Sequence, residues 1–191
     1  MKRTRWTIHD LAFCGLFSAL IAAGAFMKIT IPVQPVPMHF TLQFFFVLLA
    51  ALLLGSRRAV ASVGAYLLIG LCGIPVFASG GGLSYLLKPT FGFLLGFVVG
   101  AFFVGKVNEM RRKRTFTGLL FAAFWGLAAD YICGMLYFYI CSNYVLHVTV
   151  SWKVVFVNCF LLTVGEDFIL CILAAMLAKR LIPVFERMDR A

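Results

Sequence analysis

Of the chain's 191 residues, 63% are hydrophobic and 13% are charged, whereas an average soluble domain is roughly half apolar and about a quarter charged. A soluble fold of this length could not hide so much apolar surface from water, but lipid could solvate it, so the composition indicates one all-α integral membrane domain over residues 1–191. The formal net charge of +10 would suit a nucleic-acid partner, but the basic residues gather at the ends of apolar segments, which argues against that class.

The first predicted helix covers about residues 9–27. Its basic start is like that of a signal peptide, but the apolar run lacks a small-residue cleavage site and further spans follow, so we interpret it as a retained helix. Gly15, Ala19 and Ala23 are spaced four apart on one face. Small residues at this spacing let helices approach closely in lipid, either within the bundle or against a partner membrane protein.

Residues 28–40 contain three prolines and therefore do not form a regular helix. The helix that follows, over about residues 41–54, is short for a span of roughly 20 residues. We therefore expect the proline-rich loop to dip into the membrane, where surrounding protein must satisfy its backbone. A third helix is predicted over about residues 59–72.

Three more helices are predicted over about residues 90–107, 116–141 and 153–181, which completes a six-transmembrane-helix bundle. A loop at residues 73–90 precedes them and contains three consecutive glycines, Gly80, Gly81 and Gly82. Glycine tolerates positive φ angles and lets the backbone approach a neighbour or a ligand closely.

Basic residues are unevenly distributed between the two sides of the predicted spans. Lys28, Lys88 and Lys153 fall on one side, and the other 14 of the 17 lysines and arginines lie at the chain ends or after every second apolar segment. Cytoplasmic loops carry an excess of Lys and Arg. The asymmetry predicts that the N- and C-termini are cytoplasmic and that the glycine loop is extracellular.

No segment matches a catalytic or nucleotide-binding motif. Residues 100–107, GAFFVGKV, approach the P-loop pattern but lack its final Ser or Thr and lie within an apolar helix. The six cysteines lack a CxxC or Cys/His metal spacing. We therefore expect no catalytic residue, no metal and no cofactor, and active transport would draw its energy from another protein or an ion gradient.

Three acidic residues, Asp130, Glu166 and Asp167, lie deep within predicted helices. The other four lie near cytoplasmic ends, where we expect them to be solvated: Asp10, Glu109, Glu186 and Asp189. An acid at mid-bilayer costs about 2.5–3.5 kcal/mol and usually faces the bundle interior or a water-filled cavity. In helical projection, one face of the last helix carries Trp152, Cys159, Thr163, Glu166, Asp167 and Leu170, whereas Asn158 points away from it.

The deep acids have two interpretations. They could pair with polar neighbours such as Trp125, Tyr131 or Tyr137 and hold helices together, or they could form a polar ligand pocket. Polar or flexible residues on the outer side favour the pocket, and the candidate set is Thr41, Gln43, Gly80, Gly81, Gly82, Tyr85, Lys88, Asp130, Thr163, Glu166 and Asp167. Two carboxylates could also act as acid and base, but no histidine lies within a predicted span and nothing places a substrate bond between them.

Three segments resemble the BioY family, the biotin-specific substrate-binding (S) components of energy-coupling factor (ECF) transporters. They are ALIAAGAF at 19–26, PVQPVPMHFTLQFFFVLLAALLLG at 32–55 and GIPVFASGGGLSYLLKPTFGFLLGF at 73–97. The PVP turn and the glycine run before PTFG are distinctive as a pair. With the six-span layout the resemblance covers almost the whole chain, more weakly in the last two helices.

The resemblance implies that the chain binds biotin in a cavity near the outer surface of the cell membrane, closed by the loops between helices 1 and 2 and between helices 3 and 4. It also implies association with a transmembrane coupling protein and two cytoplasmic ATPases through small residues of the first helix, here Gly15, Ala19 and Ala23. The S component then topples in the membrane to deliver the vitamin, and it is not an enzyme. An S component for another small vitamin and a membrane-embedded acid/base enzyme are the alternatives.

One position departs from the family pattern. BioY proteins commonly carry Pro-Gly-Asp in the last helix, with a lysine three residues beyond the Asp. Here Asp167 aligns with that acid, follows Gly-Glu, and has Leu170 in the lysine position. The resemblance gives Asp167 the role of accepting hydrogen bonds from the ureido N–H groups of biotin. Lys88, with Lys28 as second choice, is then our candidate partner for the ligand carboxylate.

Overall fold

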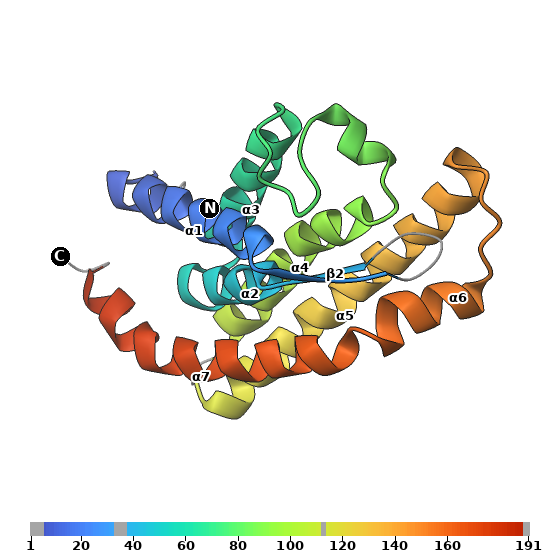
Figure 1. Ribbon diagram of the computed structural model, residues 1–191. Helices are drawn as coiled ribbons and strands as arrows, with labels where there is room; N and C mark the ends of the chain where they lie inside the picture. Colours follow the sequence, from blue (N-terminus) through green and yellow to red (C-terminus); the bar gives the residue numbers. More distant parts are fainter. Residues whose placement is uncertain (1–5, 33–37, 112–113, 189–191) are drawn as a thin grey trace.

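The computed structural model describes residues 6–32, 38–111 and 114–188, and most of this part is helical (Figure 1). Its α-helices are α1 (Ile8–Phe26), α2 (Gln43–Leu54), α3 (Ser56–Leu71), α4 (Phe91–Met110), α5 (Phe116–Ile140), α6 (Trp152–Phe156) and α7 (Val164–Met188). Shorter segments are the 3₁₀ helix η1 (Leu83–Leu87) and the π-helical segments η2 (Cys141–Val145) and η3 (Val157–Leu161). Two strands, β1 (Lys28–Ile31) and β2 (Met38–Thr41), lie between α1 and α2.

Four of the described helical segments are long and apolar enough to cross a bilayer: Ile8–Phe26, Phe91–Met110, Phe116–Val145 and Trp152–Phe185. Helix α2 is apolar but shorter, because β2 takes up the residues before it. Large apolar side chains are exposed along these segments, as expected for helices that face lipid. The molecule is therefore a helical membrane protein, and the count of six spans stays a prediction.

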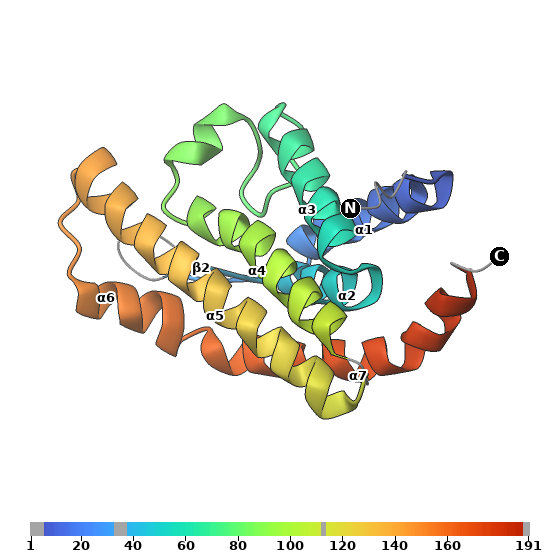
Figure 2. The same cartoon turned by 180° about the vertical axis from the view of Figure 1, so that it is seen from behind.

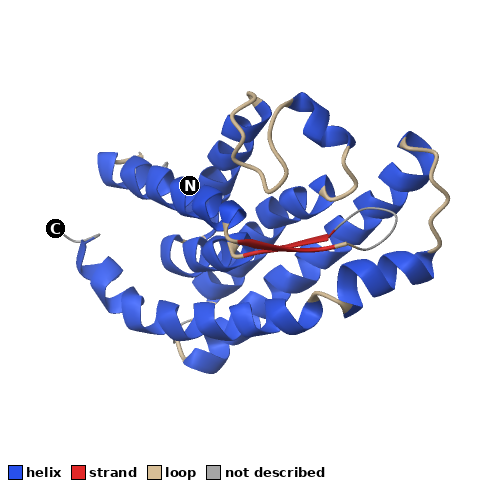
Figure 3. Ribbon diagram, in the orientation of Figure 1, coloured by secondary structure: helices blue, strands red, loops and turns tan. Residues whose placement is uncertain are grey.

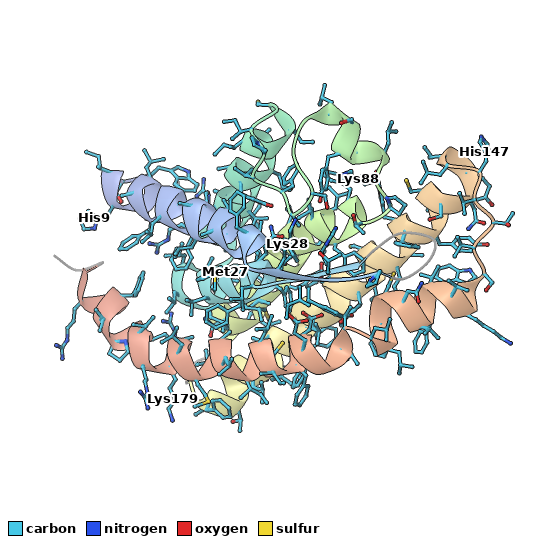
Figure 4. The ribbon with its side chains drawn as sticks, viewed as in Figure 1. His9, Met27, Lys28, Lys88, His147 and Lys179 are labelled. Carbon is cyan, nitrogen blue, oxygen red and sulfur yellow. The ribbon has the colours of Figure 1, made fainter. Side chains whose placement is uncertain are left out.

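The start of α1 and the end of α7 lie at one end of the molecule, and the connection between α5 and α6 lies at the other (Figures 1 and 2). Figure 4 labels His9 and His147 at these two ends. This arrangement agrees with termini on one side of a membrane, while the assignment of that side to the cytoplasm stays a prediction from the basic residues. Some of those residues lie outside the described ranges: Lys2, Arg3, Arg5, Arg112, Lys113 and Arg190.

Helices α4 and α5 lie side by side over most of their length (Figure 2). Gly92, Gly96 and Gly100 recur every four residues along α4 and contact α5. A Cβ atom at Gly92 would overlap the Tyr137 side chain, and one at Gly96 would overlap the Asp130 carboxyl group. This glycine spacing lets the helix backbones approach closely and sets Asp130 directly against α4.

Strands β1 and β2, at the two ends of the proline-rich stretch, pair as an antiparallel hairpin that crosses the helices (Figure 3). Lys28 pairs with Thr41 and Thr30 with His39, and the β-branched residues of β1 suit an extended strand. The prediction that this stretch is not helical is confirmed for its described residues, and the all-α description needs this hairpin added. Pro35 lies outside the described residues, as does Pro37.

The last predicted helix, over residues 153–181, is interrupted. Helix α6 passes into η3, and a turn at residues 162–163 precedes α7. A π-helical segment changes the number of residues per turn, so positions before it lose the phase predicted for the helix after it. Trp152 is 49% exposed and stacks on Tyr139 with ring centroids 4.4 Å apart, so its predicted place on the inward face is wrong. Asn158, predicted to point away, is buried.

Two acids near the predicted cytoplasmic ends are accessible to solvent, as predicted, since Glu109 is exposed and Asp10 is partly exposed, and both also take part in the fold. Asp10 belongs to the capping box of α1 and pairs with Arg58 at 3.0 Å. Glu109 Oε1 accepts hydrogen bonds from the backbone N and the Oγ of Ser56, at 2.7 and 2.9 Å. This contact joins the end of α4 to the start of α3. Two acids of this group have no described side chain: Glu186 and Asp189.

Candidate ligand-binding site

A cavity that is partly open to solvent lies between the β hairpin and helices α2, α4, α5 and α7, with about 700 Å³ of empty space when the open solvent at its mouth is included. Its lining residues are His39, Phe40, Thr41, Gln43, Phe44, Ala78, Tyr85, Thr90, Phe93, Leu94, Phe97, Asp130, Thr163, Glu166 and Asp167. Small-molecule sites are usually concave and mostly apolar, with a few placed polar groups. The cavity is therefore the candidate ligand site.

Three carboxyl groups line this cavity, and we call them the acidic cluster: Asp130 of α5, and Glu166 and Asp167 of α7. The turn at residues 162–163 starts α7 beside α5, so the first turn of α7 carries both of its acids to the cavity. The break in the last helix thus positions the site. It replaces the single helical face that the sequence predicted.

Tyr131 joins α5 to the start of α7. Its hydroxyl group donates to Asp167 Oδ2 at 2.5 Å and lies 2.6 Å from Thr163 Oγ1, and Thr163 donates to the Cys159 carbonyl oxygen at 2.7 Å. The predicted pairing of a deep acid with Tyr131 is therefore confirmed for Asp167. These bonds fix the orientation of the Asp167 carboxyl group, whose Oδ1 atom takes no hydrogen bond from the described part of the chain.

Asp130 has a different environment. The residue is 4% exposed, and its buried Oδ1 atom has no hydrogen-bond partner among the described residues. Buried polar groups in proteins are nearly always hydrogen-bonded to protein or to ordered water. Asp130 thus lines the cavity with a carboxyl group that is not satisfied by the described residues, and its Oδ1 atom packs against Gly96 of α4.

Gln43 lines the cavity, but its polar groups are already engaged. Its Nε2 atom donates to Tyr66 Oη at 2.5 Å, and its Oε1 atom accepts from Thr41 Oγ1 at 3.3 Å. Tyr66 in turn donates to the Val76 carbonyl oxygen at 3.3 Å. These bonds tie the start of α2 to α3 and to the loop after it, so Gln43 positions the cavity wall.

Beside the cavity, the hairpin and the loop after α3 are held together by contacts that we call the loop latch. His39 Nε2 lies 2.8 Å from Ser79 Oγ, and Lys28 Nζ donates to the Ala78 carbonyl oxygen. Lys88 Nζ donates to the Ser79 carbonyl oxygen at 2.9 Å and lies over the Tyr85 ring. Figure 4 labels both lysines near the hairpin and η1. The latch closes one side of the cavity with loop residues.

The latch lysines also act on His39 electrostatically. Burial of the ring lowers the pKa of His39 below its ordinary value, and the positive charges of Lys28 and Lys88 lower it further. At neutral pH the ring is therefore uncharged, so one of its nitrogens donates and the other accepts. The positive charge near this side of the cavity belongs to the two lysines, which are not among the lining residues.

Most of the predicted ligand-binding residues line the cavity, namely Thr41, Gln43, Tyr85, Asp130, Thr163, Glu166 and Asp167. Lys88 and the three glycines do not. Gly80 and Gly82 have φ angles of +114° and +93°, and a Cβ atom at Gly81 would overlap the Ile74 carbonyl oxygen. The glycines therefore shape the loop after α3 rather than contact the cavity.

The apolar wall that α4 contributes was not predicted from the sequence, and it consists of Phe93, Leu94 and Phe97. Phe93 and Phe97 are four residues apart and Leu94 and Phe97 are three apart, which is the spacing of residues on one face of a helix. In a membrane helix, however, apolar residues face both lipid and protein, so the pattern alone could not single out a ligand-facing side.

The small residues of α1 lie on its outer face. Gly15, Ala19 and Ala23 are exposed, and no atom lies within 4 Å of a Cβ placed at Gly15. Ser18 and Ile21 occupy the buried side of the same helix. The small-residue stripe therefore does not pack inside the described bundle, and its surface remains available to lipid or a partner.

Comparison with known proteins decides the family, because the BioY family model matches residues 1–187. This chain belongs to the BioY family. A protein of Lysinibacillus sphaericus named "Probable biotin transporter BioY" is 41% identical over 176 residues, which cover 92% of this chain and 88% of the relative. "Biotin transporter BioY" of Thermotoga maritima is 39% identical over 175 residues, covering 91% of this chain and 96% of the relative.

A solved structure shares the fold of this BioY-family chain. The crystal structure at 2.1 Å of the S-component for biotin from an ECF-type ABC transporter matches it with a TM-score of 0.79 and 24% sequence identity, covering 93% of this chain and 94% of the other. BioY proteins are transporters, so this chain is not an enzyme, and the acid/base enzyme considered from Glu166 and Asp167 is excluded.

Leu170, which stands where the family resemblance led us to expect a lysine, is buried in the apolar core and does not line the cavity. Within the described ranges the lining contains no lysine or arginine, so no described cationic side chain lies beside the acidic cluster in the cavity wall.

Proposed function

We propose that this chain binds biotin and acts as the substrate-binding S component of an ECF-type transporter. The observation that carries the proposal is the cavity in a BioY-family chain, with carboxyl groups on its helices and lysines on the adjoining hairpin and loop. Biotin has N–H donors on its fused rings and a carboxylate at the end of an apolar tail. The N–H donors of biotin thus complement the carboxyl groups of the protein, and the carboxylate of biotin complements the lysines.

The ring end of biotin fits the acidic cluster. Asp167, oriented by Tyr131, accepts hydrogen bonds from the ureido N–H groups. The fused rings and tail contact the apolar wall, which includes Phe44, Phe93 and Phe97. Burying such rings against aromatic side chains supplies most of the affinity, and the polar contacts fix orientation.

The carboxylate end extends toward the loop latch. Lys88 is the first candidate to pair with it and Lys28 the second. Each ammonium group has three donors, so the hydrogen bond that each already makes to a loop carbonyl leaves others for the ligand.

Transport requires partner proteins in this proposal. A transmembrane coupling protein and two cytoplasmic ATPases supply the energy, and the coupling protein contacts Gly15, Ala19 and Ala23 on the outer face of α1. The chain crosses the cell membrane six times with both termini cytoplasmic, so the cavity opens to the extracellular side. Single cysteines placed in residues 78–88 should then react with a membrane-impermeant reagent from outside, and those in residues 108–110 only from inside.

Isothermal titration calorimetry of the full chain in detergent, prepared from biotin-depleted cells, tests the ligand. We expect saturable binding of one biotin per chain, with no binding and no displacement by thiamine or riboflavin. Binding of one of these vitamins without binding of biotin would overturn the ligand assignment and favour an S component of different specificity.

A further inference from the structure

Asp130 lacks the partners that a buried carboxylate needs. Its carboxyl group packs against Gly96, and the Oδ1 atom has no hydrogen bond from the described residues. The other two carboxyl groups of the acidic cluster line the same cavity, and the described cavity lining holds no lysine or arginine. An ionised carboxylate is strongly disfavoured in such surroundings. The neutral acid is the form that fits this site.

A neutral carboxyl group carries one O–H donor, which changes what Asp130 offers to a ligand. Several hydrogens near the acidic cluster are already used within the protein. The hydroxyl groups of Tyr131 and Thr163 donate to protein oxygens, and one N–H of Gln43 donates to Tyr66. The hydrogen of a neutral Asp130 adds a donor to the acidic cluster itself.

We propose that Asp130 is held as a neutral carboxylic acid and donates its hydrogen to the carbonyl oxygen of the ligand's cyclic urea. This inference rests on the proposed function, because the ureido group of biotin combines two N–H donors with one carbonyl acceptor. Asp167 accepts from the N–H side, and Asp130 satisfies the oxygen.

This pairing makes Asp130 a residue that determines specificity. It selects a cyclic urea over a ring in which the carbonyl oxygen has been replaced by a hydrogen-bond donor. The biotin analogue 2-iminobiotin is such a ligand, since its protonated guanidinium group presents N–H₂ where biotin presents oxygen. The ratio of the two dissociation constants therefore reports on the hydrogen of Asp130.

The experiment measures the dissociation constants of biotin and 2-iminobiotin for the wild type, Asp130→Ala and Asp130→Asn, using the full chain in detergent. In Asp130→Ala we expect biotin to bind about 10-fold to 100-fold more weakly and 2-iminobiotin to lose less, so the preference shifts toward 2-iminobiotin. Asp130→Asn keeps an N–H donor in the same place and should bind biotin within about threefold of the wild type. Because Oδ1 makes no hydrogen bond from the described residues, the Tm of the ligand-free variants should stay close to that of the wild type.

Three outcomes would overturn the inference. If Asp130→Ala shifts the preference toward biotin, Asp130 is an anion that attracts the guanidinium group. If the preference does not change, Asp130 does not contact the ring. If Asp130→Asn loses as much affinity for biotin as Asp130→Ala, donation is not its role. In each case the wild type still binds biotin, whereas a wild type that does not bind biotin refutes the proposed function and this inference together.

Discussion

Within the acidic cluster, Asp167 is oriented by a hydrogen bond that it accepts from the Tyr131 hydroxyl group at 2.5 Å. A hydrogen bond to a charged group contributes about 1.5–3 kcal/mol, and each 1.4 kcal/mol corresponds to about tenfold in affinity. We therefore expect Asp167→Ala to weaken binding of biotin and of a biotin amide alike, by about 10-fold to a few hundred-fold, measured by calorimetry. Asp10→Ala, an acid substitution outside the cavity, serves as the control and should leave binding unchanged.

Lys88 tests the other end of the ligand. If its ammonium group pairs with the biotin carboxylate, the pair is lost for biotin amides, whose tails carry no charge. Lys88→Met should therefore narrow the affinity gap between biotin and a biotin amide, whereas Asp167→Ala leaves that gap as it is. An unchanged gap in Lys88→Met would mean that Lys88 serves the loop latch alone, and Lys28→Met becomes the next variant to titrate.

Gly96 is the point where α4 comes closest to the acidic cluster, and a Cβ atom there would overlap the Asp130 carboxyl group and backbone. Overpacking of this kind typically costs about 1–3 kcal/mol, so Gly96→Ala should lower the Tm and weaken biotin binding. Gly64→Ala is the matched control, because nothing lies within 4 Å of a Cβ at Gly64. Its Tm should hold or rise, since alanine is the better helix former. Equal Tm values for the two variants would contradict the close α4–α5 contact.

At the scale of secondary-structure elements, the contact between the hairpin and the loop after α3, made by His39 and Ser79, should depend on pH. The pKa of His39 is lowered from its ordinary value of 6.5 by burial and by Lys28 and Lys88. Between the lowered pKa and 6.5 the unfolded chain binds more protons than the folded chain, so the free energy of unfolding falls as the pH drops through this window and is unaffected above it. The wild type should therefore lose more Tm than His39→Gln between pH 7.5 and 5.5. If the Tm of the wild type and that of His39→Gln fall equally over this pH range, His39 does not titrate in the latch.

The sequence predicts the long helices well because apolar length is a strong signal in a membrane protein. It predicts their interruptions poorly. The turn at residues 162–163 and the π-helical segment before it carry no proline or glycine that would mark them. The hairpin was also missed, because the prolines in residues 28–40 exclude a helix without specifying strand pairing, which depends on tertiary contacts such as that between His39 and Ser79.

The site residues that could be predicted from the sequence are those whose side chains are costly to place in lipid. Asp130 and Asp167 stand out because acidic residues are rare within membrane helices and usually face the bundle interior or a water-filled cavity. Phe93 and Phe97 did not, because an aromatic residue facing a ligand looks the same in sequence as one facing lipid. The glycines of α4 could have been found from their four-residue spacing, and this signal points to Gly96 and so to the wall behind Asp130.

Across the whole molecule, the cavity and the exposed stripe of α1 occupy different faces. The cavity is lined from α2, α4, α5 and α7, whereas α1 packs mainly on α2 and α3 through its buried side. Changes on the outer face of α1 therefore do not reach the ligand directly. If the stripe is the docking surface for a coupling protein, binding and transport should be separable by mutation.

Ala19 and Ala23 are the residues with which to separate binding from transport. Both are exposed on α1, so a larger side chain at either position would point away from the bundle. Ala19→Trp and Ala23→Trp should leave the biotin affinity within about twofold, which is well under 1 kcal/mol. They should abolish co-purification with the coupling protein and ATP-dependent uptake, since bulky residues block close helix approach. Leu136→Trp, at an exposed position on α5, is the control and should retain both activities. Equal loss of binding and uptake in the α1 variants would mean that the stripe supports the fold of the S component and is not its docking surface.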